Sequence, residues 1–288
     1  MQAVILGLVA AASFGGVFVA LRWAYAKTGV GSTQAAVISV STAALIVTTI
    51  AVATGAFAGL TVSSALPYVV SGLFAPGLSH LAMYRSIDTF GGTRTAVVLG
   101  FVPVLAVLGA WLVLDEAPGW LVAVGGVFVV AAGILIVDPR AAFSSGRVGA
   151  SPLLALVAVL CFASRDVVVR GVDVVLAAVA GSAFSLVTAA ILLVGVNATS
   201  ARTEIVAAVR NHLGPLLVPG LFMAVGFTSL IAGFSQGKVA VVSTMAATQS
   251  VWAVIMARLF LDRSEWDRRV VIASLLATAG GIIVAVGA

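Results

Sequence analysis

Residues 28–84 contain no Asp, Glu, Lys or Arg. A stretch of this length cannot belong to a water-soluble domain, because much of any folded surface must face water and carries charged side chains there. The same bias holds along the whole chain, since 62% of its 288 residues are hydrophobic and 9% are charged, against roughly 25% charged residues in soluble domains. The chain is therefore predicted to be an integral membrane protein. Soluble enzymes, disordered tails and disulfide scaffolds are excluded as classes.

The formal net charge of +5 raises the question of nucleic-acid binding. However, the Lys and Arg residues occur singly or in pairs at the ends of apolar runs, which is typical of anchors at an anionic membrane surface. We therefore expect the lipid bilayer as a partner and no nucleic acid. The single cysteine, Cys161, lies in an apolar run and cannot form an internal disulfide.

About 20 apolar residues are needed for a helix to cross the hydrocarbon core. The charge-poor runs supply ten such stretches, so the fold class is an all-α integral membrane protein with ten transmembrane helices. The long uncharged run must be divided, and residues 54–64, rich in Gly, Ser and Thr, are the natural turn. The predicted spans are 3–21, 33–53, 65–84, 95–114, 118–137, 152–170, 174–196, 214–234, 240–261 and 270–287.

An internal repeat is predicted from matches at a nearly constant offset. Arg22 matches Arg170 at an offset of 148, and residues 112–115 match 259–262 at an offset of 147. The Pro-, Ser- and Gly-containing linker 138–151 divides the chain into a first five-helix repeat, 1–137, and a second, 152–288. Because each repeat has an odd number of spans, the second must be inverted relative to the first, an arrangement common in transporters.

Residues 96–116, with Pro103 and with Leu114-Asp115-Glu116 at the end, resemble the fourth span of EamA-type members of the drug/metabolite transporter superfamily. Gly125-Gly126 and Gly133-Ile134-Leu135 resemble the fifth span of that family. The second copy is looser, with Asp262-Arg263 in place of the acidic turn. The resemblance implies a secondary transporter, an exporter of small metabolites or amphipathic compounds working by alternating access. It also implies a central cavity lined by spans one, three, four and their counterparts.

The sequence contains no HExxH, GxSxG, P-loop, CxxC or Gly-rich nucleotide motif. We therefore expect no catalytic residues and no cofactor. His80 and His212 are far apart in the sequence, which gives a metal site little support. Without a nucleotide site, transport must be driven by a coupling proton or ion, or by the gradient of the small-molecule substrate itself.

Arg165 and Asp166 are the leading candidate site residues, because ionisable groups within a span are costly and usually functional. In one interpretation, span six ends at Ser164 and the pair lies in an interfacial loop. In the other, the Arg165 fork grips a substrate carboxylate or phosphate, while Asp166 keeps the site neutral or takes a proton.

Three further residues are candidate substrate contacts. His80 shares a helix face with Tyr84, and the pair is either a group of interfacial anchors or part of a polar stripe facing the pore. Gln249 lies in the most polar span and either bonds a neighbouring helix or contacts substrate. Trp252, well inside the same span, is the one Trp expected to line a cavity.

Two alternative functions remain open. The first is translocation of a lipid or lipid-linked substrate. The second, an intramembrane enzyme, would need a nucleophile or metal cluster within the spans, and the sequence offers none. A scaffold would usually carry a larger soluble part.

The expected location is the plasma membrane of a prokaryote. Twelve of the 15 Lys and Arg residues fall on one side of the predicted topology, and the other three are Arg165, Arg170 and Lys238. The positive-inside rule then places both termini outside, whereas the family resemblance favours both termini inside.

Overall fold

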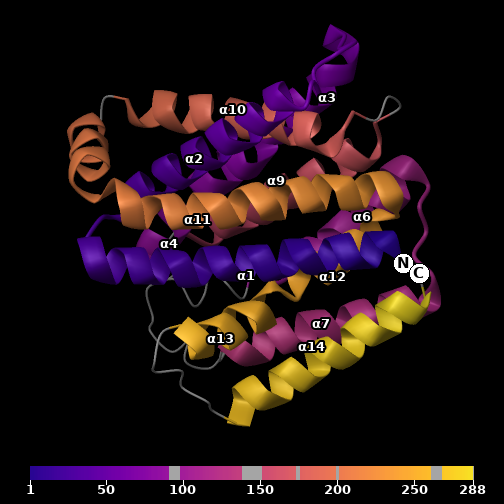
Figure 1. Ribbon diagram of the computed structural model, residues 1–288. Coiled ribbons are helices and arrows are strands. Elements are labelled where there is room, and N and C mark those ends of the chain that lie inside the picture. Colours follow the sequence, from indigo (N-terminus) through magenta and orange to yellow (C-terminus); the bar gives the residue numbers. More distant parts are fainter. Residues whose placement is uncertain (91–97, 138–150, 173–175, 199–200, 261–267, 288) are drawn as a thin grey trace.

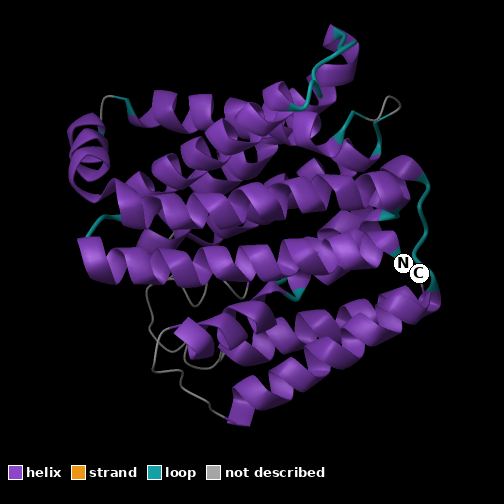
Figure 2. Ribbon diagram, viewed as in Figure 1, coloured by secondary structure: helices purple, strands orange, loops and turns teal. Residues whose placement is uncertain are grey.

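A computed structural model describes residues 1–90, 98–137, 151–172, 176–198, 201–260 and 268–287. Every element in these ranges is a helix, as Figures 1 and 2 show. Seven helical stretches are long and apolar enough to cross a membrane, and three shorter apolar helices accompany them at 102–114, 120–135 and 275–284. The all-α membrane fold is confirmed. Each of the ten predicted spans contains a described helix, although three of these helices are short.

The helices follow the chain in an order that matches the predicted spans. The first half contains α1 (Gln2–Thr28), α2 (Ser32–Ala53), α3 (Val62–Gly72), η1 (Leu73–Leu78), α4 (Ser79–Phe90), α6 (Val102–Leu114) and α7 (Trp120–Val137). The second contains α9 (Ser151–Arg170), α10 (Ala178–Asn197), α11 (Arg202–Gln236), α12 (Val239–Ala247), α13 (Gln249–Phe260) and α14 (Arg268–Gly287). The predicted linker 138–151 lies outside the described residues except for Ser151, the first residue of α9.

Both termini lie at the same end of the bundle, on the right in Figure 1. We call this the proximal end and the opposite one the distal end. Helix α1 begins at the proximal end, whereas α9 ends there, because its last residue, Arg170, pairs with Glu116 beyond the end of α6. The first helices of the two halves therefore run in opposite directions.

The helix pairings repeat between the halves. Helix α7 packs along α14, and α2 packs along α10. Helix α1 packs on span eight (α11), and its counterpart α9 packs on span three (α3, η1 and α4). Helix α1 also packs on span nine (α12 and α13), and α9 packs on span four (α6). Exchanging each helix for its counterpart leaves this set of pairings unchanged. Such a pattern is the one that two structurally related halves produce.

Small residues let the helices approach closely, as expected where lipid replaces water and packing must hold helices together. A Cβ atom added to Gly125 in α7 would lie 2.6 Å from the carbonyl oxygen of Gly280 in α14. The reverse substitution meets the same obstacle, since a Cβ on Gly280 would lie 2.7 Å from the carbonyl oxygen of Gly125. The backbones of α7 and α14 are thus in direct contact at this point.

Several spans are interrupted. Ala75 has an extended backbone (φ −147°, ψ 129°) next to Pro76, which breaks span three between α3 and α4. Thr248 separates α12 from α13, and a turn at 100–101 precedes α6 at the corresponding place in the first half. Spans four and nine are therefore both discontinuous.

The connection before span eight differs from the prediction. His212, which the predicted spans leave in a connection, interrupts the helix α11 with a non-helical backbone (φ −136°, ψ 21°). The residues before it, 202–211, include helix-forming Glu, Ala and Arg and make a short helix that turns sideways at the distal end in Figure 1. The predicted turn at 54–64 is confirmed, with α3 starting at a capping box formed by Thr61 and Ser64.

Candidate substrate site

Helix α9 continues to Arg170 and carries Arg165 and Asp166 within the bundle. Their relative exposures are 6% and 2%. The interpretation in which span six ends at Ser164 and leaves the pair in an interfacial loop is therefore wrong. The apolar residues 167–169 keep the helix in the membrane, and α11 and α12 cover the two charged groups.

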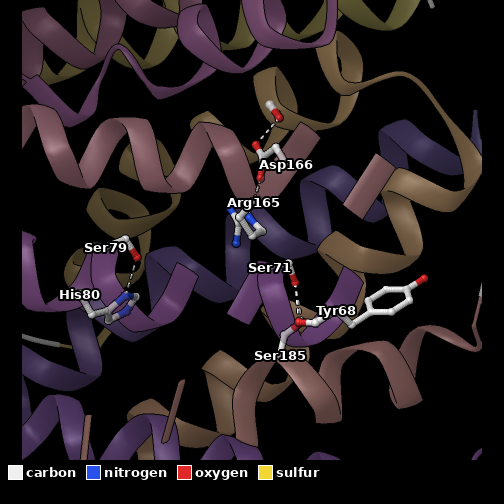
Figure 3. A network of polar contacts seen from close by, with 8 residues as sticks. Tyr68, Ser71, Ser79, His80, Arg165, Asp166 and Ser185 are labelled. Carbon is white, nitrogen blue, oxygen red and sulfur yellow. Dashed lines mark hydrogen bonds and ion pairs between the residues drawn. The ribbon is translucent and has the colours of Figure 1, made fainter. Parts of the chain in front are cut away.

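Both oxygens of Asp166 accept hydrogen bonds. The Nε–H of Arg165 donates to Oδ1 at 2.6 Å, and the hydroxyl of Ser243 in α12 donates to Oδ2 at 2.5 Å. Figure 3 shows Asp166 beside Arg165. Because an isolated charge in a low-dielectric interior costs several kcal/mol, a paired and bonded carboxylate is the form that burial permits.

The Arg165 guanidinium lies between two aromatic rings. Its central carbon is 5.8 Å from the centre of the Phe162 ring and 5.3 Å from that of Phe227 in α11. Ring faces attract a cation but accept no strong hydrogen bond. Among the described residues, the only acceptor bonded to this guanidinium is Asp166, through Nε. The two terminal nitrogens thus keep their donors available for a planar anion.

His80 lies at the start of α4 with a relative exposure of 8%. Its Nδ1 is 3.3 Å from the Ser79 hydroxyl, and its ring centre is 5.8 Å from those of Tyr84 and Phe162. Tyr84 is buried as well, so both side chains are covered by neighbouring helices. Phe162 touches both His80 and Arg165 and connects the two groups.

Gln249 and Trp252 lie elsewhere, where α13 meets α1. A Cβ atom added to Gly15 of α1 would be 2.8 Å from both the Gln249 carbonyl oxygen and the Trp252 Cβ. In the described part of the chain, no hydrogen bond or ring contact links either residue to the Arg165–Asp166 pair. Three of the five predicted site residues are therefore brought together, and two belong to a helix contact.

The family model of the EamA-like transporters matches residues 1–138. The matched residues, just under half of the chain, are similar to this family. The similarity indicates a membrane transporter of the drug/metabolite type.

The transporter also resembles a solved crystal structure along nearly its whole length. The TM-score is 0.76 at 14% sequence identity, covering 99% of this chain and 96% of the other. At this identity the likeness establishes the fold alone. No curated protein sequence matches the transporter.

Two cavities lined by described residues lie at opposite ends of the transporter. The larger, about 670 Å³, is a groove at the proximal end between α1, α10 and α11. Its lining residues are Gln2, Ile5, Leu6, Leu176, Ala177, Ala178, Ala232, Ser235 and Gln236. The smaller, about 30 Å³, lies beside Tyr84, Arg85 and Asn197 towards the distal end. Neither is lined by any of the five predicted site residues, and the Arg165–Asp166 pair is itself buried.

A second buried polar network serves packing. The hydroxyls of Ser71 and Ser185 are 2.8 Å apart, and Ser185 also donates to the Tyr68 carbonyl at 2.9 Å. These bonds join α3 to α10, so both hydroxyls have partners within this pair of helices, as Figure 3 shows. No group of three or more His, Cys, Asp or Glu residues in the described chain is arranged to hold a metal ion.

The residues that complete the site are Ser243, Phe162 and Phe227. The polarity of span nine marks Ser243 in the sequence, but only folding brings it to Asp166, 77 positions away. The two Phe residues carry no signal that separates them from other apolar residues of their spans.

Proposed function

We propose that this protein is a secondary transporter that exports small metabolites or amphipathic compounds by alternating access, and that Arg165 binds an anionic group of the substrate. The observation that carries the proposal is that the two members of the buried pair have different partners. Each oxygen of Asp166 accepts a bond, from Arg165 or Ser243, while the central carbon of the Arg165 guanidinium lies 5.8 and 5.3 Å from two ring centres.

The geometry of a helix supports this division. Consecutive residues project about 100° apart, so Arg165 and Asp166 cannot both face one ligand. With Asp166 turned to α12 and the guanidinium turned to Phe162 and Phe227, a carboxylate or phosphate would add two parallel hydrogen bonds to the fork. The aromatic neighbours would contact an apolar part of the same substrate.

His80 is proposed as a second polar contact, because Phe162 lies between it and Arg165. Gln249 and Trp252 are assigned to the α1–α13 contact instead. The opposite directions of α1 and α9, and the enclosed position of the pair, favour a cycle in which two related halves open the site to alternate sides.

We propose the plasma membrane of a prokaryote as the location. The energy source is a coupled proton or ion, or the substrate gradient.

The test begins with binding. Purified transporter is heated with benzoate, phenylpropionate, glycerol phosphate or tetraphenylphosphonium, and the melting temperature is recorded. Ligands that bind the folded form raise it. We expect anions to stabilise the parent and to lose this effect in Arg165→Ala. Stabilisation by the cation alone, or equal anion effects in parent and variant, would contradict the proposal.

A second candidate function is lipid translocation, favoured by the proximal groove. This groove combines apolar Ile5, Leu6 and Leu176 with the amides of Gln2 and Gln236, and Ile5 is exposed. An amphipathic molecule at the membrane interface would match such a lining. Scrambling of a fluorescent phospholipid in proteoliposomes, measured beside uptake of the labelled anions, separates the two functions.

A further inference from the structure

The contacts between α9 and α12 form two levels, one helical turn apart. At the deeper level, Ser243 of α12 donates to Asp166 of α9. Arg170 lies four residues beyond Asp166, and Val239 lies four residues before Ser243. Because α9 and α12 run in opposite directions, these two residues meet at the next level towards the proximal end.

Glu116 joins the two helices at this outer level. Its Oε1 is 2.7 Å from the Nε of Arg170, and its Oε2 accepts a hydrogen bond from the backbone N–H of Val239 at 3.2 Å. Lys238, the residue before α12, provides no side-chain cap. A carboxylate from the first half of the chain therefore caps a helix of the second half, where the helix dipole favours a negative charge.

The outer level lies over the site. Residues 163, 166 and 170 share one face of α9, so the Glu116–Arg170 pair lies one turn above Asp166 on the way to the proximal surface. The Glu116 side chain is 13% exposed and that of Arg170 33%, which places the pair at the boundary between the interior and the proximal solution.

Helix α12 is a short segment bounded at both ends. It has nine residues, begins at the Glu116 contact and ends at the break before Gln249. Discontinuous helices form the binding sites of many transporters with inverted repeats, in which one part of the bundle moves against another. The two levels are the described polar bonds that hold this short helix to α9 and Glu116.

We propose that Glu116, Arg170 and the start of α12 form the proximal gate of the transporter, and that Ser243 couples this gate to the substrate site. This inference rests on the proposed alternating-access function. Opening the proximal side separates Val239 from Glu116 and swings α12 away from α9. Ser243 then leaves Asp166, so the gate and the charge balance around Arg165 change together.

The inner level of the gate lacks its carboxylate in the first half. At the repeat offset of 148, Phe18 stands where the second half has Asp166. The outer level keeps a basic residue, since Arg22 matches Arg170. Opening on the proximal side therefore exposes a carboxylate that the sequence of the first half does not repeat.

The experiment measures access to a reporter thiol and needs no transported solute. Ala163→Cys in a Cys161→Ser background places one thiol a turn below Asp166, at a buried position. Its reaction rate with a water-soluble maleimide is followed on purified protein in lipid nanodiscs. We expect Glu116→Gln and Ser243→Ala each to raise the rate about tenfold, equivalent to about 1.4 kcal/mol in the opening equilibrium.

Two matched controls address nonspecific loosening. Ser182→Ala removes a buried hydroxyl whose one bond among the described residues goes to the Ala178 carbonyl of its own helix. Glu204→Gln changes a carboxylate that contacts Gln34 at the distal end. Both should react at the parent rate. Ser243→Thr keeps the hydroxyl and should also match the parent.

Charge reversal decides the role of the outer level. The double variant Glu116→Arg with Arg170→Glu restores an ion pair but removes the acceptor for the Val239 N–H, so its rate should fall between the parent and Glu116→Gln.

The proposal is overturned if Glu116→Gln and Ser243→Ala react at the parent rate, or if Ser182→Ala accelerates the reaction equally. The thiol assay contains no substrate. If no anion stabilises the parent in the melting assay, the proposed function is contradicted, but the result of the thiol assay still stands.

Discussion

At the scale of single residues, the chain places a cation and an anion side by side in an apolar helix and bonds the anion twice. Arg165 has one described hydrogen bond, and Asp166 has two. Removing one member of a buried pair leaves the other charge without compensation, which costs more than the pair itself contributes. The sequence alone signals the two charges, because they interrupt an apolar run. It does not signal Ser243 as the partner, since that contact depends on how α9 and α12 pack.

This balance predicts a non-additive pattern of stability. Asp166→Asn and Arg165→Met should each lower the free energy of unfolding by about 3–5 kcal/mol, the range for breaking a buried pair. The double variant should lose less than the sum of the two, because neither charge is then stranded. Denaturant unfolding in micelles measures all four states of this cycle. Additive losses would show that the two groups act independently.

At the scale of the helices, the transporter relies on backbone contact at particular glycines. Gly125 of α7 meets Gly280 of α14, whereas Gly133, eight residues later in α7, has no described neighbouring atom within 4 Å of the position that a Cβ would occupy. The sequence predicts the spans from the length of their apolar runs. The glycines of span five match those of the family that the sequence resembles. The predicted spans do not include the interruptions at Ala75 and Thr248. Pro76 marks the first in the local sequence, whereas no proline accompanies the second, which depends on how neighbouring helices satisfy the backbone.

Two alanine substitutions in α7 test this difference. Gly125→Ala should destabilise the transporter by about 1–3 kcal/mol, the usual effect of overpacking. Gly133→Ala should be neutral or stabilising by about 0.5–1 kcal/mol, because alanine favours the helix without a clash. Thermal unfolding compares the two variants with the parent. Equal melting temperatures for both would contradict the close packing of α7 and α14.

At the scale of the whole molecule, both termini lie at the proximal end, so one reporter fixes the orientation of the transporter. In the predicted topology, 12 of the 15 Lys and Arg residues fall in the connections opposite the termini, which predicts that both termini face outside. Alkaline phosphatase fused after Ala288 should then be active in cells, and a fused fluorescent protein that matures only in the cytoplasm should be dark. The reverse pattern would show that the family orientation overrides the charge count, and would place the Glu116–Arg170 gate on the cytoplasmic side.

The central claim is that Arg165, with its charge balanced by Asp166, binds the substrate of an alternating-access transporter, and transport per folded molecule tests it most directly. Proteoliposomes preloaded with an unlabelled anion that stabilises the parent are given the same anion in labelled form outside, and counterflow is measured for the parent, Arg165→Lys, Asp166→Asn and the control Ser182→Ala. We predict counterflow by the parent and the control, and a loss of about tenfold or more in both site variants, since Lys lacks the planar fork and Asn leaves Arg165 uncompensated. Equal counterflow by all four proteins would contradict the account.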